Sequence, residues 1–414
     1  MKDDQGWDLG GTALFWVRCL SAGCVFVSSA AFAQGSVTLY GVADVGLYYS
    51  SVSQSAQGAT PARQGTQIGI SSGGQSGSRF GLKGVEPLSS GRDVGFVLEG
   101  GINLAQGTMA QGGLGFGRQA TLWLSDRQLG KLEMGRRANV AFTYMTAIDP
   151  LGLAGSQATM GASFGSANSV RYNNLVVYQT PTYRGFQASI GYSFNTGATA
   201  VYANGPFQSQ QPATSFFGSG ENLRALTSGL RYQSGPLLVM ATYDQAYGAS
   251  TVQNPAGTVI TGNTNKGSPK AWILGATYDL KVVKLAAAFG QTIGGAFFGQ
   301  GAGAGQSVAM PLATATRGAG MLFDQGLQTQ QYLIGGTIPF GERARLALSW
   351  QFMRPVTGSV SADPSATQSI ASAMYTYDLS RRTNIYIWGS YGNNFQTIQT
   401  ARTTALGMGV RHLF

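Results

Sequence analysis

Alternation of apolar and polar side chains over about ten residues is the feature that most constrains the fold of this chain. In residues 345–353, large apolar side chains occupy every second position, and polar or small side chains lie between them. Residues 94–101 and 237–244 alternate in the same way. Because successive side chains of a β-strand point to opposite faces, such a strand has one face suited to lipid and one suited to water. The pattern predicts membrane-spanning strands, with a soluble β-sandwich as the alternative.

Sixteen segments carry this alternation, and an even number is what a closed antiparallel barrel requires if both chain ends lie on the same side. They are roughly 36–49, 77–86, 93–104, 116–125, 130–137, 170–180, 185–195, 222–233, 236–247, 270–280, 282–292, 328–338, 342–353, 368–379, 383–393 and 401–414. Short turns alternate with long loops rich in Gly, Ser, Ala and Gln, notably about 138–168, 249–268 and 293–326. In a soluble sandwich, short and long connections are not expected to alternate. In a barrel inserted into a membrane from one side, the turns that cross the membrane are short and the outer loops can be long. We therefore predict an all-β, 16-stranded antiparallel transmembrane β-barrel with short periplasmic turns and long outer loops.

Composition excludes several other classes of protein. The 414 residues include 27 basic and 17 acidic side chains, so charged residues make up 11% of the chain, where a soluble globular domain has about 25%. Mean hydropathy is +0.00, and no run of 18 apolar residues follows residue 33, which excludes a helical membrane protein. The 61 glycines have no three-residue period and aromatic residues reach 11%, which excludes collagen and low-complexity disorder.

Residues 1–33 are predicted to be a signal peptide that is removed after export, leaving residues 34–414 as the barrel. Both cysteines, Cys19 and Cys24, lie in this segment, so the mature chain has no disulfide and no thiolate metal site. The segment contains two of the 27 basic and three of the 17 acidic residues, which leaves 25 and 14 and a formal net charge of +11. This excess of positive charge favours interaction with anions. Nucleic acid is disfavoured as a partner, because the basic residues are scattered singly.

Strand parity also nominates the side chains that face the inside of the barrel. The inward basic candidates are Arg79, Lys83, Arg171, Arg231 and Arg345, and the inward acidic candidates on the pore wall include Asp44, Glu99 and Asp244. Placing an Arg or Lys on the lipid face near the midplane would cost about 2–4 kcal/mol, so these assignments have an energetic basis. Tyr40 and Trp123 also have inward parity.

Short segments spread over the mature chain carry a family resemblance. They are residues 36–44 (SVTLYGVAD), 78–84 (SRFGLKG), 116–120 (FGRQA), 132–136 (LEMGR), 171–174 (RYNN), 178–181 (YQTP), 185–186 (GF), 377–383 (YDLSRRT) and 411–414 (RHLF). Together they resemble the trimeric general porins of Gram-negative outer membranes, in their betaproteobacterial-type branch. The resemblance implies a homotrimer in the outer membrane, surrounded by lipid and lipopolysaccharide. It also implies a third outer loop that folds inward to narrow the pore.

The resemblance further implies roles for individual residues. It places Arg79, Arg118, Arg136 and Arg171 at the pore constriction, to which inward parity adds Lys83. It makes the terminal Phe414 part of the signal read by the barrel-assembly machinery. Arg118 and Arg136 share a strand face with leucine or methionine, so they require a β-bulge or a position above the apolar band.

The predicted function is a water-filled channel for passive diffusion of small hydrophilic solutes and inorganic ions. Asp149 is the one acidic residue between about 138 and 168, so a strongly acidic constriction loop is not assumed. A ring of guanidinium groups opposite a carboxylate such as Asp149 would create a transverse field that favours anions over cations. A substrate-specific outer-membrane channel with aromatic side chains along its wall is the alternative, and a soluble secreted β-adhesin is a third reading.

Enzymatic activity is not predicted. Outer-membrane lipases and proteases usually need histidine as a general base, and the one histidine, His412, lies two residues from the end with lipid-side parity. The Gly-x-Gly sequences lack the βαβ setting that would bind a phosphate, so no cofactor is expected. No cluster of histidine or cysteine residues suits a metal, although a calcium site built from carboxylates stays open.

Overall fold

The computed structural model describes residues 36–55, 63–89, 91–168, 170–197, 199–202, 208–209, 223–248, 251–253, 259–261, 268–297, 300, 320–357 and 366–414. The predicted signal peptide, residues 1–33, lies outside the described residues, as do much of the predicted loop 249–268 and residues 301–319 of the predicted loop 293–326. No helix in the described ranges is both long and apolar enough to span a membrane.

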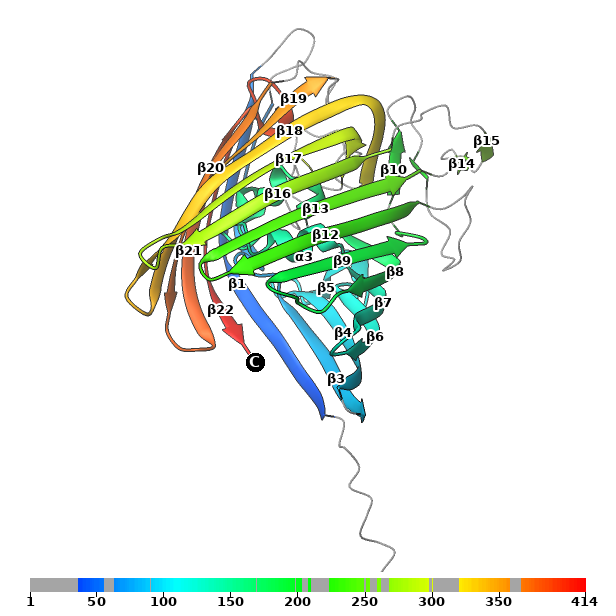
Figure 1. Ribbon diagram of the computed structural model, residues 1–414. Helices are drawn as coiled ribbons and strands as arrows, with labels where there is room; N and C mark the ends of the chain where they lie inside the picture. Colours follow the sequence, from blue (N-terminus) through cyan, green and yellow to red (C-terminus); the bar gives the residue numbers. More distant parts are fainter. Residues whose placement is uncertain are drawn as a thin grey trace, which may run out of the picture.

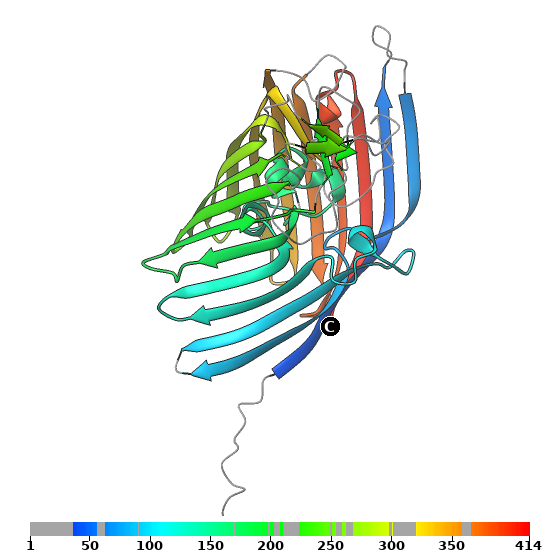
Figure 2. The same ribbon diagram turned by 90° about the vertical axis from the view of Figure 1, so that its right-hand side faces the viewer.

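A closed antiparallel barrel of sixteen strands forms the molecule (Figure 1, Figure 2). The strands are β1 (Ser36–Gln54), β3 (Arg79–Ser89), β4 (Arg92–Asn103), β6 (Gln119–Asp126), β7 (Gly130–Ala138), β8 (Arg171–Gln179), β9 (Phe186–Ser193), β12 (Arg224–Ser234), β13 (Leu237–Tyr247), β16 (Lys270–Asp279), β17 (Lys284–Ala296), β18 (Gly320–Phe340), β19 (Ala344–Thr357), β20 (Gln368–Asp378), β21 (Thr383–Asn393) and β22 (Arg402–Leu413). Each strand pairs with the next, and β22 pairs with β1 to close the ring. All sixteen predicted segments are confirmed as strands.

Two strands in succession pair with the same edge of β1. Residues 45–54 of β1 pair with β2 (Arg63–Ser72), and residues 36–42 of β1 pair with β3. Residues 73–78 connect the two and are called the inward turn below. The prediction missed β2, because its Gly, Ser and Gln content resembles that of an outer loop. It also began β18 at about 328, whereas the strand begins at Gly320.

Loops of different length leave the two ends of the barrel, as predicted. One end carries short turns, such as residues 127–129, 235–236 and 341–343. The other end carries the long loops with their small elements, which are β5 (Thr108–Met109), α2 (Ala110–Gly113), β10 (Thr199–Tyr202), β11 (Gln208–Ser209), β14 (Thr251–Gln253), β15 (Val259–Thr261) and η4 (Phe395–Thr397). At this end β10 pairs in parallel with the start of β18. The two ends therefore differ in the way expected of a barrel inserted from one side.

Side chains alternate between the two faces of the wall. On β22, Leu406, Met408 and Val410 are exposed on the outer face, whereas Thr403 and Ala405 are buried on the inner face. An exposed apolar outer band is what a lipid environment requires. On this strand the outer and inner faces are those that the alternation predicts.

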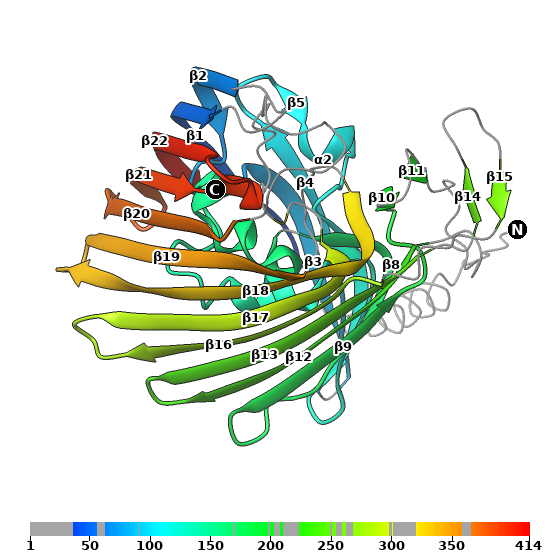
Figure 3. The same cartoon turned by 90° about the horizontal axis from the view of Figure 1, so that it is seen from above.

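The third long loop, residues 139–168 and called L3 below, folds into the barrel. It contains α3 (Val140–Met145) and the short turns η1 (Ser156–Ala158), η2 (Met160–Ala162) and η3 (Gly165–Ala167). Seen from above, its helical turns lie inside the ring of strands (Figure 3). The inward-folded third loop implied by the family resemblance is confirmed.

L3 makes part of the barrel interior dry. Its side chains Met145, Ile148 and Phe164 belong to a buried apolar cluster that also includes inward-facing Met240 and Ile273. Strand parity alone would assign the inward side chains of β13 and β16 to water. They are apolar because L3 covers them, so the aqueous passage is confined to the rest of the interior.

Candidate functional site

The root of L3 is fixed to the barrel wall by buried polar groups. The side-chain amide of Asn139 donates to a carboxylate oxygen of Asp244 (2.9 Å) and to the carbonyl of Ser166 (2.8 Å). The backbone N–H of Val140 donates to the Thr227 hydroxyl (2.8 Å). Asp244 faces inward as predicted, but it is fully buried and holds L3 instead of lining the open lumen.

The middle of L3 reaches the opposite part of the wall. The side-chain amide of Gln351, on β19, donates to the carbonyl of Thr159 (2.9 Å). The backbone N–H of Gly155 donates to the carbonyl of Gly74 (3.0 Å), which joins L3 to the inward turn. L3 is therefore held at several points and divides the lumen as a fixed partition.

Asp44 holds the inward turn in place. One carboxylate oxygen accepts hydrogen bonds from the backbone N–H groups of Gln75 (2.9 Å) and Ser76 (2.6 Å), and the other accepts one from the Tyr386 hydroxyl (2.5 Å). Asp44 was expected as an acid on the pore wall. Its side chain does point inward, but it is fully buried and is not exposed to solute. Its role is to hold the inward turn against β1 and β21.

Three of the predicted residues meet on one side of the passage. Glu99, on β4, forms ion pairs with Arg118 (Nε to Oε1, 2.7 Å) and Arg79 (Nε to Oε2, 3.5 Å). The Tyr40 hydroxyl donates to the same carboxylate (3.0 Å). Arg118 lies just before β6 begins at Gln119, so strand parity does not apply to it.

Arg136 and Arg171 complete this group, called the arginine cluster below together with Arg79 and Arg118. Arg136 donates from Nε to the carbonyl of Gly117 (2.8 Å), and Arg171 donates from Nε to the carbonyl of Arg118 (3.2 Å). The Arg171 guanidinium also lies 5.7 Å from the ring centre of Phe142 in L3. Four arginines thus form this group, and two of them, Arg79 and Arg118, pair with Glu99.

A β-bulge lies opposite Arg136. The pairing of β7 with β8 shifts register between Gly135 and Arg137, and Gly135 has φ of 132°. Such a backbone conformation is accessible to glycine and strained for other residues. The extra residue of this bulge lies on β8, between Tyr172 and Leu175, whereas Arg136 keeps its regular pairing with Ala120 of β6. Arg137, which the prediction did not single out, forms an ion pair with Glu133 (2.5 Å).

Lys83 and Arg231 lie apart from the arginine cluster. Lys83 is exposed on the inner face of β3, with its ammonium nitrogen 5.4 Å from the ring centre of Tyr40. Arg231 lies near the short-turn end of β12, where its guanidinium donates to Gln233. Both have the predicted inward parity, but only Lys83 approaches the arginine cluster, through Tyr40, which donates to Glu99.

The placement of Asp149 corrects the prediction made for it. Its side chain is only 5% exposed, and its oxygens accept the N–H groups of Leu151 (3.0 Å), Leu153 (3.2 Å) and Met160 (2.9 Å). Burial raises the pKa of this carboxyl group, against the opposing effect of the three hydrogen bonds. Asp149 therefore organises the backbone of L3, and the acid that faces the arginines is Glu99.

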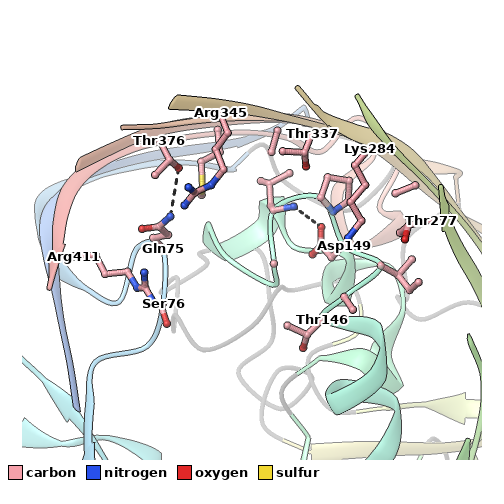
Figure 4. A pocket seen from close by; sticks show the side chains of 18 residues that line it. Gln75, Ser76, Thr146, Asp149, Thr277, Lys284, Thr337, Arg345, Thr376 and Arg411 are labelled. Atoms are coloured by element: carbon pink, nitrogen blue, oxygen red, sulfur yellow. Dashed lines mark hydrogen bonds between the residues drawn. The ribbon is translucent and has the colours of Figure 1, made fainter. Parts of the chain in front are cut away.

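A cavity of about 350 Å³ lies between L3, the inward turn and the wall formed by β16 to β22 (Figure 4). Its lining includes Thr146 and Asp149 of L3 and three basic side chains: Lys284, Arg345 and Arg411. Arg345, a predicted pore-wall residue, pairs with Asp378 (3.0 Å). Lys284 and Arg411 were not nominated, although each has the same inward parity and the same test applied to β17 and β22 would have found them.

The family model for Gram-negative porins matches residues 20–396 of the chain. The chain belongs to the Gram-negative porins. An outer membrane porin protein of Bordetella pertussis is 39% identical to this porin over 397 residues, which cover 94% of this chain and 96% of the relative. Outer membrane porin protein 32 of Delftia acidovorans is 32% identical over 232 residues, covering 50% of this chain and 63% of the relative.

Solved structures agree with this assignment at the level of the fold. An anion-selective porin from Comamonas acidovorans aligns with a TM-score of 0.64 and 23% identity, over 92% of this chain and all of the other. The protein is an outer-membrane porin, and its barrel forms a water-filled channel through which small hydrophilic solutes diffuse passively. The arginine cluster and the cavity beside L3 lie along this channel.

Proposed function

We propose that this porin is a general diffusion channel that prefers anions, with its constriction formed by the arginine cluster, the inward turn and L3. The observation that carries the proposal is the imbalance of fixed charge in the arginine cluster: Arg79 and Arg118 share the carboxylate of Glu99, whereas Arg136 and Arg171 bond to main-chain carbonyls. Guanidinium groups stay protonated at any working pH. The positive charge of the passage is therefore permanent.

The electric field that fixed charges produce in a narrow channel depends on the dielectric constant of the channel walls. Low-dielectric walls focus the field of fixed charges into the water between them, which raises the local concentration of anions and lowers that of cations. The dry core behind L3 and the lipid outside the barrel provide such walls. Each arginine of the cluster donates to at least one protein acceptor, which holds its guanidinium group in place while its charge still acts on the passage.

Substrate specificity finds less support. Tyr40 and Trp123 face inward, but Lys83 lies over the Tyr40 ring and Lys131 lies 4.8 Å from the ring centre of Trp123. Rings covered in this way do not form a continuous apolar surface for one solute. Catalysis also finds little support, because His412 is exposed on the outer face, where it bonds to the Thr383 hydroxyl (2.8 Å).

We further propose a homotrimer, assembled with part of the outer face of the barrel buried between subunits. On the described strands β8 to β21, exposed aromatic side chains occur on the outer face, as in the girdles that meet lipid headgroups. On β22 and β1 to β7 the exposed large apolar side chains are aliphatic, among them Leu39, Leu47, Leu122 and Met408. A face covered by protein needs no aromatic anchors, so this side suits contact with other copies.

Swelling of liposomes containing the purified porin tests general diffusion. Uptake of neutral sugars should fall smoothly with solute size, and an anionic solute should enter faster than a cationic solute of equal size. Uptake that saturates for one class of solute would instead show a specific channel, and faster entry of cations would contradict the proposed charge preference.

A further inference from the structure

The inward turn lies between the arginine cluster and L3 and contacts both. On one side, the Arg79 guanidinium donates from Nη1 to the Ser76 hydroxyl (3.2 Å) and to the carbonyl of Gly77 (2.9 Å). On the other side, the carbonyl of Gly74 accepts the backbone N–H of Gly155 in L3 (3.0 Å). The inward turn therefore joins the charged wall to L3, and its position affects both.

A second arginine of the cluster lies against the turn at Gly77. A Cβ atom added to Gly77 would stand 3.0 Å from Nη1 of Arg118. Gly77 is not among the residues with positive φ, so its backbone conformation is open to other residues, and the close approach of Arg118 is what its missing side chain permits. Two of the four guanidinium groups, those of Arg79 and Arg118, are thus packed on the inward turn.

The position of the turn depends in its own right on Asp44. Residues 73–78 contain only bends and no regular secondary structure, so no β-ladder fixes them. Instead, the Asp44 carboxylate accepts the N–H groups of Gln75 and Ser76 and the hydroxyl of Tyr386, and the Asp44 carbonyl accepts the N–H of Gly73 (2.8 Å). Loss of the carboxylate would leave two N–H groups of the turn and one buried hydroxyl without their acceptor.

The inward turn also borders the opening of the passage. Gln75 and Ser76 are half-buried and lie on one side of the cavity beside L3, with Thr146 of L3 across from them (Figure 4). A shift of the turn would therefore change the width of this opening and the place of the Arg79 charge at the same time.

We propose that Asp44 is a positioning residue for selection in the channel: by fixing the inward turn, it holds the Arg79 charge beside the passage and limits the size of the solutes that pass. Asp44 itself is fully buried and does not meet the solute, so it acts through the geometry of the turn. This inference rests on the proposed function and names the residue that fixes one side of the constriction.

The variants D44A and D44N separate positioning from charge, because both remove the same negative charge beside Arg411, the register partner of Asp44 on β22. In D44N the amide oxygen accepts the N–H groups of the turn and the amide nitrogen donates to the Tyr386 hydroxyl oxygen, so the turn should stay in place. D44A removes all of these side-chain partners.

Reversal potentials in a planar bilayer and swelling of liposomes give the two readouts. The permeability ratio of chloride to potassium should be at least about twofold lower in D44A than in D44N, because the Arg79 charge is no longer held at the passage. Neutral sugars should enter faster through D44A than through D44N, with the largest gain for the largest sugars. A ratio in D44A equal to or above that of D44N, or equal uptake of sugars, would overturn the proposal.

The variant G77D tests the contact of the turn with the arginine cluster while Asp44 stays intact, so it also applies if D44A does not fold. Its carboxylate would stand against Arg118 and should lower the permeability ratio at least about twofold below that of the wild type. The control G69D adds the same charge on β2, where no atom of the described residues lies within 4 Å of an added Cβ, and should change the ratio less.

Heat-modifiable migration on a gel shows which of these variants have folded. A G77D ratio equal to that of the wild type would also overturn the proposal. Wild-type current carried mainly by cations would instead contradict the proposed function, whereas the comparison of sugar uptake between D44A and D44N would still report on the inward turn.

Discussion

At the scale of residues, the electrostatics of the passage depend on which charges are free and which are bound. Asp44 and Asp149 are carboxylates by sequence, but backbone N–H groups occupy them. Glu99 is the acid that meets Arg79 and Arg118. Sequence parity identifies inward residues, but it does not reveal which of them are satisfied by main-chain groups far away in the sequence.

Glu99 is the residue whose charge most directly opposes the arginine cluster. The substitution E99Q keeps an acceptor for Arg118 and removes the negative charge. A unit charge about 6 Å from an ion in water contributes roughly 0.7 kcal/mol, a factor of about three for each ion. Because the effect has opposite sign for chloride and potassium, their permeability ratio should rise by up to about tenfold. R79Q, which removes a positive charge beside Glu99, should lower the ratio. The reversal potentials of E99Q and R79Q should shift in opposite directions from the wild-type value. Shifts of both variants in the same direction would contradict the prediction.

At the scale of elements, L3 is a partition whose shape depends on Asp149. The substitution D149N keeps one acceptor oxygen and places an amide N–H₂ where the other accepts, against either Leu151 N–H or the N–H groups of Leu153 and Met160. Loss of these hydrogen bonds should destabilise the L3 conformation by about 1–3 kcal/mol, while the strands stay paired. We expect noisier single-channel current and closure at lower voltage, with unchanged heat-modifiable migration on a gel.

A matched control for D149N is D126N, which changes a half-buried carboxylate at the short-turn end that pairs with Arg92 (2.9 Å). It should behave like the wild type. If D149N conducted as quietly as D126N, L3 would not depend on the Asp149 hydrogen bonds.

The strands were predictable because each repeats a local pattern that lipid and water both enforce. The packing inside the barrel was less predictable from the sequence. Met240 and Ile273 are apolar because L3 covers them, and L3 is placed by contacts such as Asn139 with Asp244, which are distant in sequence. The division of the second strand at the inward turn likewise depends on Asp44. Such long-range contacts leave no periodic signal.

At the scale of the whole molecule, the outer face of the barrel has an aromatic side and an aliphatic side. Leu47 on β1 is 56% exposed and Ile334 on β18 is 57% exposed, one on each side. Each of L47R and I334R places a charge on the apolar outer face, at a cost of about 2–4 kcal/mol if that face meets lipid. Only L47R should also break the trimer, because Leu47 lies on the proposed subunit interface.

Migration of unheated samples on a gel, with chemical cross-linking, distinguishes the two variants. L47R should migrate as a folded monomer and I334R as a trimer. Loss of the trimer in I334R alone would place the interface on the aromatic side and refute the proposed arrangement.

The reversal potential of the wild-type porin in a planar bilayer, under a roughly tenfold gradient of potassium chloride, tests the function most directly. An open channel with permanently charged arginines around one glutamate should give a zero-current potential of the sign set by chloride. A potential of the opposite sign, set by potassium, would contradict the proposal that this arginine cluster governs which ions pass.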